Sequence, residues 1–346
     1  MITRRRLNIG ISAAALASVS DVLFVGAASA GEPAEVVIAS YGGSFQDAQA
    51  EALFEPYAKA TGAKVIATPG TGYPKVKAMV ESGSVTWDVV SAESPAFVNE
   101  VKDGLLEPID YSVVKADGIP AKFRTLYGVG YMEFGTNLAW GKAKFPNGVT
   151  PAQFFDPKVK GRRVMPSGPT WSLEFALLAD GVKPADLYPL DVNRALKVIA
   201  RVKDQIIGYK GASEIEALIQ QGEADMVYAS TGRIKDAIKA GANWAYTWDA
   251  AVSAIEYWAV VKGAPHAKDA MKFINFAVQP KPEAELSRLL PYGPTNVDAL
   301  KLLAPAVAKD LPSYPDNAKL GAVIDAEWWQ ENYDSVNDRW MTFIMQ

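Results

Sequence analysis

Several residue types that carry common chemistries are missing or rare in this sequence. It has no cysteine, which excludes disulfide bonds, thiolate metal sites and a cysteine nucleophile. Its single histidine, His266, leaves little basis for a histidine metal site or for histidine-dependent catalysis. The 35 Lys and Arg residues face 39 Asp and Glu, and no basic tract follows the three arginines near the start. We therefore expect no nucleic-acid partner, no metal and no cofactor.

What is present describes a folded, exported protein. The 346 residues are 49% hydrophobic and 21% charged, which suits a globular chain with two domains. The opening segment has arginines at 4–6, an uncharged stretch at 7–20 and Ala28-Ser29-Ala30, the layout of a secretory signal peptide. We predict that residues 1–30 are removed after Ala30. An uncleaved anchor is the alternative, but the apolar stretch is shorter than the roughly 20 residues that span a membrane.

The export route and destination follow from the same segment. Residues 3–7 also resemble a twin-arginine signal, which would mean export in the folded state. No cysteine follows the cleavage site, so a lipid anchor is excluded. We expect a soluble, monomeric protein in the periplasm.

The rest of the chain alternates short β-branched stretches with turns and helical patterns, as α/β folds do. Strands are predicted at 35–40, 63–67, 87–91, 161–164 and 225–228. The first strand leads through the turn 41–44 into a helix from 45 to about 61, with Ser44 as its cap, and Ser94 is predicted to cap another helix. Longer strands at 128–138 and 252–261 are expected to leave the first lobe and to return to it. The C-terminal segment with Trp328, Trp329 and Trp340 is interpreted as a helix that packs on a lobe.

Candidate ligand contacts gather in the turns that follow the strands, where open α/β sheets bind ligands. Glu93 and Glu256 are candidate counter-charges for an amine. Aromatic rings attract ammonium groups, and the candidate walls of such a cage are Tyr41, Trp171, Tyr228, Tyr257 and Tyr292. The alternative is that these rings only pack the interiors of the lobes.

Arg233 lies in the predicted first turn of a helix, where the helix dipole disfavours a cation. We interpret it as a partner for an anion, either a ligand carboxylate or Glu256. A solvated surface arginine is the alternative.

Catalytic motifs are absent from the sequence. Gly70-Thr71-Gly72 lacks both the third glycine of a dinucleotide fingerprint and the end of a phosphate-binding loop. Neither a Gly-x-Ser-x-Gly elbow nor a His-Glu-x-x-His helix occurs, and His266 is expected at the surface. Paired carboxylates for glycoside hydrolysis are not excluded, because their spacing is spatial.

Ordered segments along the whole chain resemble one family. They include Val37-Ile38-Ala39-Ser40-Tyr41-Gly42-Gly43, Phe54-Glu55-Pro56-Tyr57, Trp87-Asp88-Val89-Val90, Lys272-Phe273-Ile274-Asn275-Phe276 and Tyr292-Gly293-Pro294-Thr295-Asn296. The chain resembles the periplasmic solute-binding proteins of ABC importers, in the spermidine/putrescine-binding branch. The resemblance implies the type II periplasmic-binding-protein fold, two α/β lobes joined by crossing strands with the ligand between them. Its implied boundaries are 31–136 with 255–297 for lobe 1, and 137–254 with 298–346 for lobe 2.

The resemblance also implies contact residues and partners. The similar positions are Tyr41, Ser44, Ser91, Glu93, Trp171, Tyr228, Glu256 and Tyr292, with Tyr228 in place of a family tryptophan and Glu256 in place of an aspartate. Polyamine binders carry an acidic pair in the turn that is Ser167-Gly168-Pro169-Thr170-Trp171 here, which has no carboxylate. A bound polycation would leave an ammonium unpaired there.

The sequence therefore predicts a non-enzymatic binding protein that delivers a small amine-containing solute to an inner-membrane ABC permease. The solute is a polyamine such as putrescine or spermidine, or a shorter zwitterion such as an ω-amino acid or a betaine. Two alternatives stay open at this point. One is a secreted hydrolase or transferase, and the other is a ferric-ion binder of the same superfamily, against which the absence of a Tyr-Tyr pair counts.

Overall fold

The computed structural model describes residues 34–346, which form one compact unit. The predicted signal peptide at 1–30 lies outside these residues. Among the helices of residues 34–346, none is both long and apolar enough to cross a membrane.

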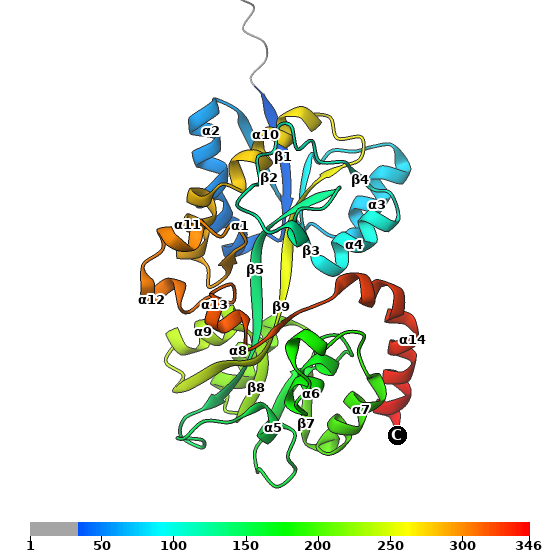
Figure 1. Cartoon of the computed structure of the whole chain (residues 1–346), viewed down its shortest axis with the longest axis vertical. Helices are drawn as coiled ribbons and strands as arrows, with labels where there is room; N and C mark the ends of the chain where they lie inside the picture. The colour runs from blue at the N-terminus through cyan, green and yellow to red at the C-terminus, as the bar shows by residue number, and fades with distance from the viewer. Residues whose placement is uncertain (1–33) are drawn as a thin grey trace, which may run out of the picture. The chain divides into compact units, whose positions relative to one another are not determined.

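One mixed sheet organises the fold, and two of its strands are much longer than the others. The sheet order is β2-β1-β3-β9-β5-β8-β6-β7. The strands are β1 (Glu35–Ser40), β2 (Lys64–Pro69), β3 (Val89–Glu93), β5 (Gly128–Gly141), β6 (Arg163–Pro166), β7 (Ile206–Tyr209), β8 (Met226–Ser230) and β9 (Trp244–Val261). β5 and β9 pair antiparallel over most of their length and run side by side through the middle of the unit (Figure 1). The two crossing strands were predicted, and both extend beyond the predicted ranges.

Parallel strands lie on either side of this antiparallel pair, as expected for α/β units. β1 pairs parallel with β2 and with β3, and β6 pairs parallel with β7 and with β8. The short strands β4 (Leu106–Glu107), β10 (Gly293–Pro294) and β11 (Ala322–Val323) add to β9 or β5. The carboxyl ends of β1, β3, β6 and β8 lead directly or through short turns into helices.

The helices that follow β1, β2 and β3 belong to the first part of the unit. They are α1 (Gly43–Gln49), a π-helical turn (Ala50–Phe54), α2 (Glu55–Thr61), α3 (Tyr73–Ser82) and α4 (Ser94–Lys102), joined later by α10 (Ala267–Ala277) and α11 (Pro280–Leu289). The predicted cap at Ser44 is wrong. The N-cap is Gly42, whose φ of 77° is easily reached by glycine, so the helix starts one residue before Ser44.

Ser94 is likewise not a cap. α4 begins at Ser94 with Glu93 as N-cap, and the Ser94 hydroxyl donates to the carbonyl of Ile255 on β9, 2.7 Å away. The backbone N–H of Ile255 donates back to the same hydroxyl at 2.9 Å. Ser94 therefore ties α4 to a crossing strand instead of closing a helix end.

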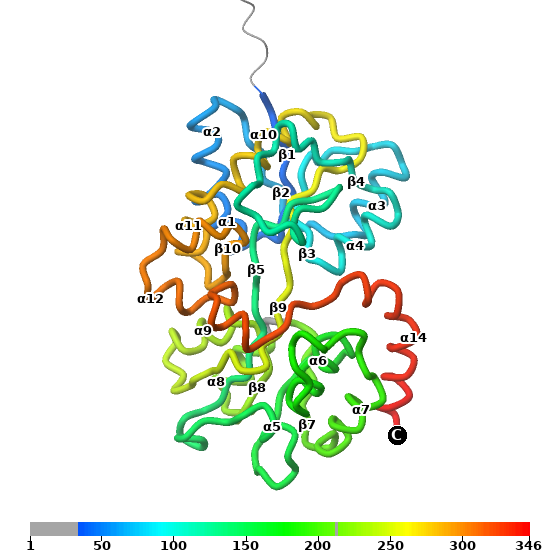
Figure 2. Tube along the Cα trace, viewed as in Figure 1, coloured from blue at the N-terminus to red at the C-terminus, as the bar shows by residue number. Residues whose placement is uncertain are grey.

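The remaining helices follow the strands of the second part. They are α5 (Pro151–Phe154), α6 (Ser172–Ala179), α7 (Val192–Ala200), α8 (Ala212–Gln220), α9 (Thr231–Lys239), α12 (Pro305–Ala308), α13 (Pro315–Ala318) and α14 (Ala326–Met345). α14 packs against α7 and also contacts α4 (Figure 2). Its Trp329 and Trp340 are buried, in agreement with the prediction of a packed C-terminal helix.

The buried apolar residues fall into two main clusters, and the crossing strands contribute to both. The first contains Trp258 and Met132, and the second contains Leu138 and Ala254. We call the regions around them the first lobe and the second lobe. On β9 the change from one cluster to the other falls between Ala254 and Ile255. A substrate that contacts both lobes must therefore lie beside this stretch of β5 and β9.

Candidate functional site

The carboxylate of Glu256 is held by a buried hydrogen-bond network at the end of β1 and β3. The hydroxyls of Tyr41 and Ser91 both donate to its Oε1, each at 2.8 Å. Ser91 also contacts the Tyr131 hydroxyl at 2.8 Å, and the side-chain amide of Gln49 donates to that hydroxyl at 2.8 Å. Because both hydroxyl donors use Oε1, the other oxygen of Glu256 is left for a further partner.

Glu93 lies directly across from Glu256. The two residues are paired in the antiparallel ladder of β3 and β9, so both side chains are on the same face of the sheet. Burial raises the pKa of Glu93 to about 7, and burial together with the charge of Glu93 raises the pKa of Glu256 to about 8. The pair therefore favours a cationic or hydrogen-donating group that would compensate its charge.

A hollow of about 450 Å³ opens on this face of the sheet and is lined from both lobes. Glu93 contributes from the first lobe. The second lobe contributes the loop from Pro166 to Trp171, together with Tyr209, Lys210, Ile215 and Ser230. Phe134 and Thr136 line it from β5, and Tyr333 from α14.

Trp171 occupies an unusual backbone conformation at this hollow. Its φ of 74° is rare for a residue with a side chain, and it is the N-cap residue of α6. Conformations of this kind cost of order 1–3 kcal/mol and tend to occur at functional sites. This residue therefore lines the hollow immediately before the first turn of α6.

A series of aromatic rings connects Trp171 to Tyr41. Ring centroids are 6.0 Å apart for Trp171 and Phe134, 6.3 Å for Phe134 and Tyr292, 6.2 Å for Tyr292 and Phe45, and 5.6 Å for Phe45 and Tyr41. Tyr292 also lies close to Gly232 at the start of α9, where a Cβ would approach the Tyr292 hydroxyl to 3.0 Å. Aromatic surface therefore extends from the acidic pair in the first lobe to the helix N-termini of the second lobe.

The side of the hollow away from Glu93 has the opposite electrostatic character. The exposed Lys210 lies there together with the hydroxyl-bearing loop before α6. The first turn of α6 is already partnered, because the Leu173 N–H donates to the carbonyl of Pro169 and the turn carries the buried carboxyl group of Glu174, so the positive charge at this end is that of Lys210. The arrangement thus offers acceptors at one end and donors with positive charge at the other.

Of the predicted contacts, Glu93 and Trp171 line this hollow, and Tyr41, Ser91, Glu256 and Tyr292 belong to the hydrogen-bonded and aromatic network described above without lining it. The others lie elsewhere. Tyr228 is fully buried in the second lobe, where its ring stacks on Phe175 with centroids 4.0 Å apart. Tyr257 stacks on Phe97 at 4.3 Å, and Ser44 is exposed on α1. Arg233 pairs with Glu216 of α8 at 2.8 Å rather than with Glu256. Glu216 was not among the partners predicted for Arg233.

Several lining residues were not predicted from the sequence. Phe134 and Thr136 lie in the middle of a strand rather than at its end, but their two-residue spacing on β5 could have placed them on one face. Lys210 and Tyr333 belong to a loop and to the C-terminal helix, and no local pattern marks them.

The described part of the chain contains no cluster of three or more His, Cys, Asp or Glu side chains suited to a metal ion. His266 is only partly exposed, and its Nδ1 lies 3.0 Å from Oδ2 of the buried Asp88. His266 does not line the hollow.

Comparisons with known proteins identify relatives along nearly the whole chain. A family model described as bacterial extracellular solute-binding protein matches residues 52–316. A gamma-aminobutyric acid-binding protein of Pseudomonas aeruginosa is 35% identical over 332 residues, which cover 93% of this chain and 94% of that protein. The spermidine/putrescine-binding periplasmic protein of Escherichia coli is 24% identical, with 76% of this chain and 79% of that protein covered.

Solved structures show the same fold. The binding protein AgtB of Agrobacterium tumefaciens R10, in complex with agropinic acid, is 76% identical and matches with a TM-score of 0.78 over 90% of this chain and 99% of that one. An ABC transporter substrate-binding protein of Bradyrhizobium japonicum, 34% identical, matches with a TM-score of 0.86 over 90% of this chain and 100% of that one.

Proposed function

This chain belongs to the family of bacterial extracellular solute-binding proteins, the substrate-binding subunits of ABC importers, and we propose that its solute is an opine acid, with agropinic acid as the first candidate. Proteins of this family bind solutes and do not convert them. The 76% identity to AgtB, a protein bound to agropinic acid, carries the choice of solute.

The geometry of the hollow supports an acid with hydrogen-donating groups. A carboxylate fits the end formed by Lys210 and the hydroxyl groups of Ser167 and Thr170. Hydroxyl or amino groups fit the end formed by Glu93, which lies across the strand ladder from the buried Glu256, and the rings of Trp171 and Phe134 provide apolar walls.

Gamma-aminobutyric acid (GABA) is the second candidate. It carries an ammonium group and a carboxylate, which match the two ends of the hollow in sign. The P. aeruginosa relative named for this ligand is 35% identical, and a solved GABA receptor, Atu4243, is 32% identical with a TM-score of 0.80.

Polyamines are the less supported part of the sequence prediction. Relatives named for spermidine or putrescine are only 21–24% identical. The second-lobe lining of the hollow contains Lys210 and no carboxylate. If one ammonium group of a diamine paired with Glu93, the other would therefore lie unpaired beside the Lys210 cation.

Binding is proposed to close the two lobes over the solute. The lining comes from both lobes, so the full set of contacts exists only when the lobes approach each other. The TM-score with AgtB is 0.78 at 76% identity, and the TM-score with the B. japonicum protein is 0.86 at 34% identity. Because the more similar sequence superposes less well, the two solved structures support lobe arrangements that differ within one fold. We also propose that the protein works in the periplasm after removal of residues 1–30.

Calorimetric titration tests this proposal. Residues 31–346 are purified, unfolded and refolded to remove any bound solute, and titrated with agropinic acid, GABA and putrescine. We expect one site that prefers agropinic acid, and recovery of the solute unchanged. Tightest binding of putrescine would contradict the choice of solute class, and turnover of the solute would contradict a binding role.

A further inference from the structure

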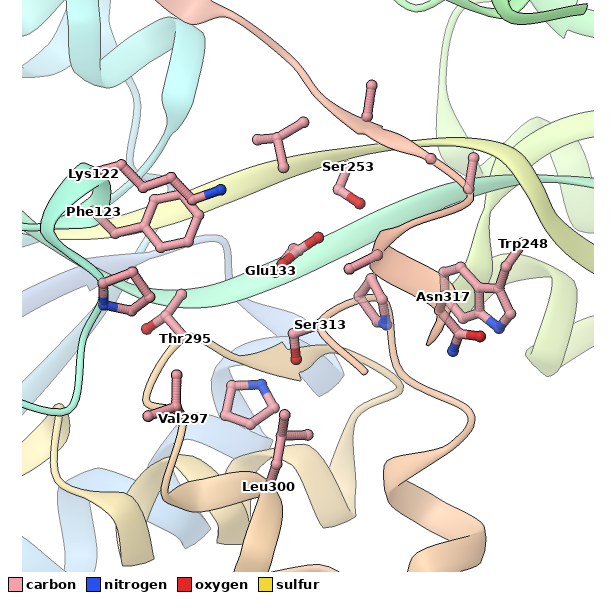
Figure 3. Close-up of a pocket in the computed structure, with 18 residues that line it drawn as sticks. Lys122, Phe123, Glu133, Trp248, Ser253, Thr295, Val297, Leu300, Ser313 and Asn317 are labelled. Atoms are coloured by element: carbon pink, nitrogen blue, oxygen red, sulfur yellow. The ribbon is translucent and has the colours of Figure 1, made fainter. Parts of the chain in front are cut away.

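A second hollow, of about 220 Å³, lies on the opposite face of the crossing strands (Figure 3). Side chains of successive strand residues point to opposite faces. Phe134 faces the first hollow and Glu133 faces the second. Ser253, which also lines the second hollow, precedes Glu256 by an odd number of residues on β9. The two hollows therefore lie on opposite faces of β5 and share no lining residue.

Two opposite charges, Glu133 and Lys122, line the second hollow without forming a salt bridge within residues 34–346. Glu133 is only 7% exposed, and burial raises the pKa of its carboxyl group against the smaller lowering effects of a hydrogen bond with Ser253 and of the charge of Lys122. The ammonium of Lys122 lies 4.7 Å from the centre of the Phe123 ring, near the rim. None of the salt bridges formed within residues 34–346 joins Lys122 to Glu133, although both side chains reach into the same space (Figure 3).

An unused hydroxyl group adds to this lining. The Ser313 Oγ atom is buried and has no hydrogen-bond partner within the described residues. Such a group costs of order 1–3 kcal/mol unless a ligand or water satisfies it. Ser313 sits beside Gly293, where a Cβ would collide with its hydroxyl group.

From this juxtaposition we infer that the second hollow is a binding site for a small amino-acid zwitterion. Its ammonium group pairs with Glu133 in the interior, and its carboxylate pairs with Lys122 at the rim. A zwitterion supplies both counter-charges at once, whereas a simple amine or a simple acid leaves one protein charge uncompensated. The Ser313 hydroxyl group completes the contacts, and the volume restricts the ligand to a few carbon atoms.

The position of this site couples it to lobe closure. Glu133 lies between two irregularities in the pairing of β5 with β9, at Gly130/Met132 and at Thr136/Leu138. Bulges of this kind are where a strand bends. The lining also joins Thr295 and Leu300 from the segment after β10 to Trp248 on β9. A ligand that touches all of these elements binds one lobe arrangement better than another, so it changes the affinity of the first hollow, and the effect is reciprocal.

Binding of glycine and β-alanine tests the site. Equilibrium dialysis with radiolabelled probe is expected to give one equivalent per chain at saturation, a stoichiometry that excess agropinic acid does not lower even though it shifts the affinity for the probe. Glu133→Gln and Ser313→Ala should each weaken this binding by roughly tenfold or more. Glu51→Gln, an exposed glutamate on the first lobe, is the matched control and should leave it unchanged.

The outcomes separate this inference from the proposed solute. Binding that Glu256→Gln abolishes and Glu133→Gln preserves would place the probe in the first hollow and overturn the inference. No binding, with ordered water only in a crystal structure of the second hollow, would also overturn it. The coupling rests on the proposed function, and it predicts that saturating β-alanine shifts the affinity for agropinic acid roughly tenfold. Failure of agropinic acid to bind would contradict the proposed solute and leave the dialysis result intact.

Discussion

Replacing Glu100 with glutamine should reduce the loss of stability that the protein suffers as the pH rises. Glu100 lies on α4 with 1% of its surface exposed. Neither carboxyl oxygen has a hydrogen-bond partner within the described residues. Burial without a partner raises the pKa of this carboxyl group from 4.5 to about 8.

The sign and size of the effect follow from this shift. Because the folded state binds the proton more tightly than the unfolded state, Glu100 stabilises the fold fully below its unfolded pKa, and this contribution is lost as the pH rises through the folded pKa. A shift of one unit corresponds to about 1.4 kcal/mol, so the wild type should lose about 3 kcal/mol from this residue between pH 5 and pH 8. Glutamine cannot ionise, and its unfolding free energy should lack that decrease.

Urea denaturation at pH 5 and at pH 8 measures the difference. Comparing the two pH values within each variant cancels any constant cost of burying the amide of glutamine. The exposed Glu51→Gln serves as the control, and its pH dependence should match that of the wild type. Equal losses of unfolding free energy in the wild type and Glu100→Gln would refute the reasoning, because the buried carboxyl group would then not hold its proton.

Three further predictions concern the first hollow. Trp171→Ala should weaken solute binding 10- to 100-fold in calorimetry, because it removes an aromatic wall of the hollow, and it should leave the circular dichroism spectrum unchanged. The control Trp328→Ala changes a residue outside the lining and should keep wild-type affinity. Tyr228→Phe should leave the affinity unchanged in the same titration, because the hydroxyl group has no hydrogen-bond partner within residues 34–346; a large loss would place it at the ligand. If GABA binds, its affinity should rise at least roughly 50-fold from pH 6 to pH 8, since an ammonium requires Glu256 to lose its proton; Glu256→Gln should reduce this rise to roughly tenfold, the part that Glu93 contributes with its pKa of about 7.

The crossing strands and the acidic residues at the strand ends could be predicted from local sequence. β9 is rich in β-branched and aromatic residues, β5 carries aromatic residues, and the change from a strand pattern to Ser94-Pro95 at a helix start marks Glu93. The exact pairing of Glu93 with Glu256 could not be predicted in this way, because residues 163 positions apart meet only through the register of β3 and β9. That register adds the charge of Glu93 to the burial that raises the pKa of Glu256, whereas burial alone raises the pKa of Glu93.

Tyr228 and Ser230 show why a strand end alone does not define a contact. Both lie in the last three residues of β8 and are two residues apart, so they point to the same side. Ser230 is the last residue of the strand and lines the hollow. Tyr228 lies two residues earlier, inside the second lobe, where its ring packs against Phe154 and Phe175. The depth at which helices cover the sheet separates the two positions, and that depth depends on packing between distant segments.

The alternation along β5 and β9 links the two hollows more closely than their separate linings suggest. Phe134 and Glu256 serve one face, and Glu133 and Ser253 serve the other. A change in the bend of these strands alters both faces at once, because the same backbone carries them. A shift in the register of one strand by a single residue would exchange the faces and turn Glu133 toward the solute. The bulges that flank Glu133 therefore have to permit bending of β5 and β9 without a change in their register. The antiparallel pairs on both sides of the bulges, such as Val129 with Trp258 and Trp140 with Ala245, hold that register.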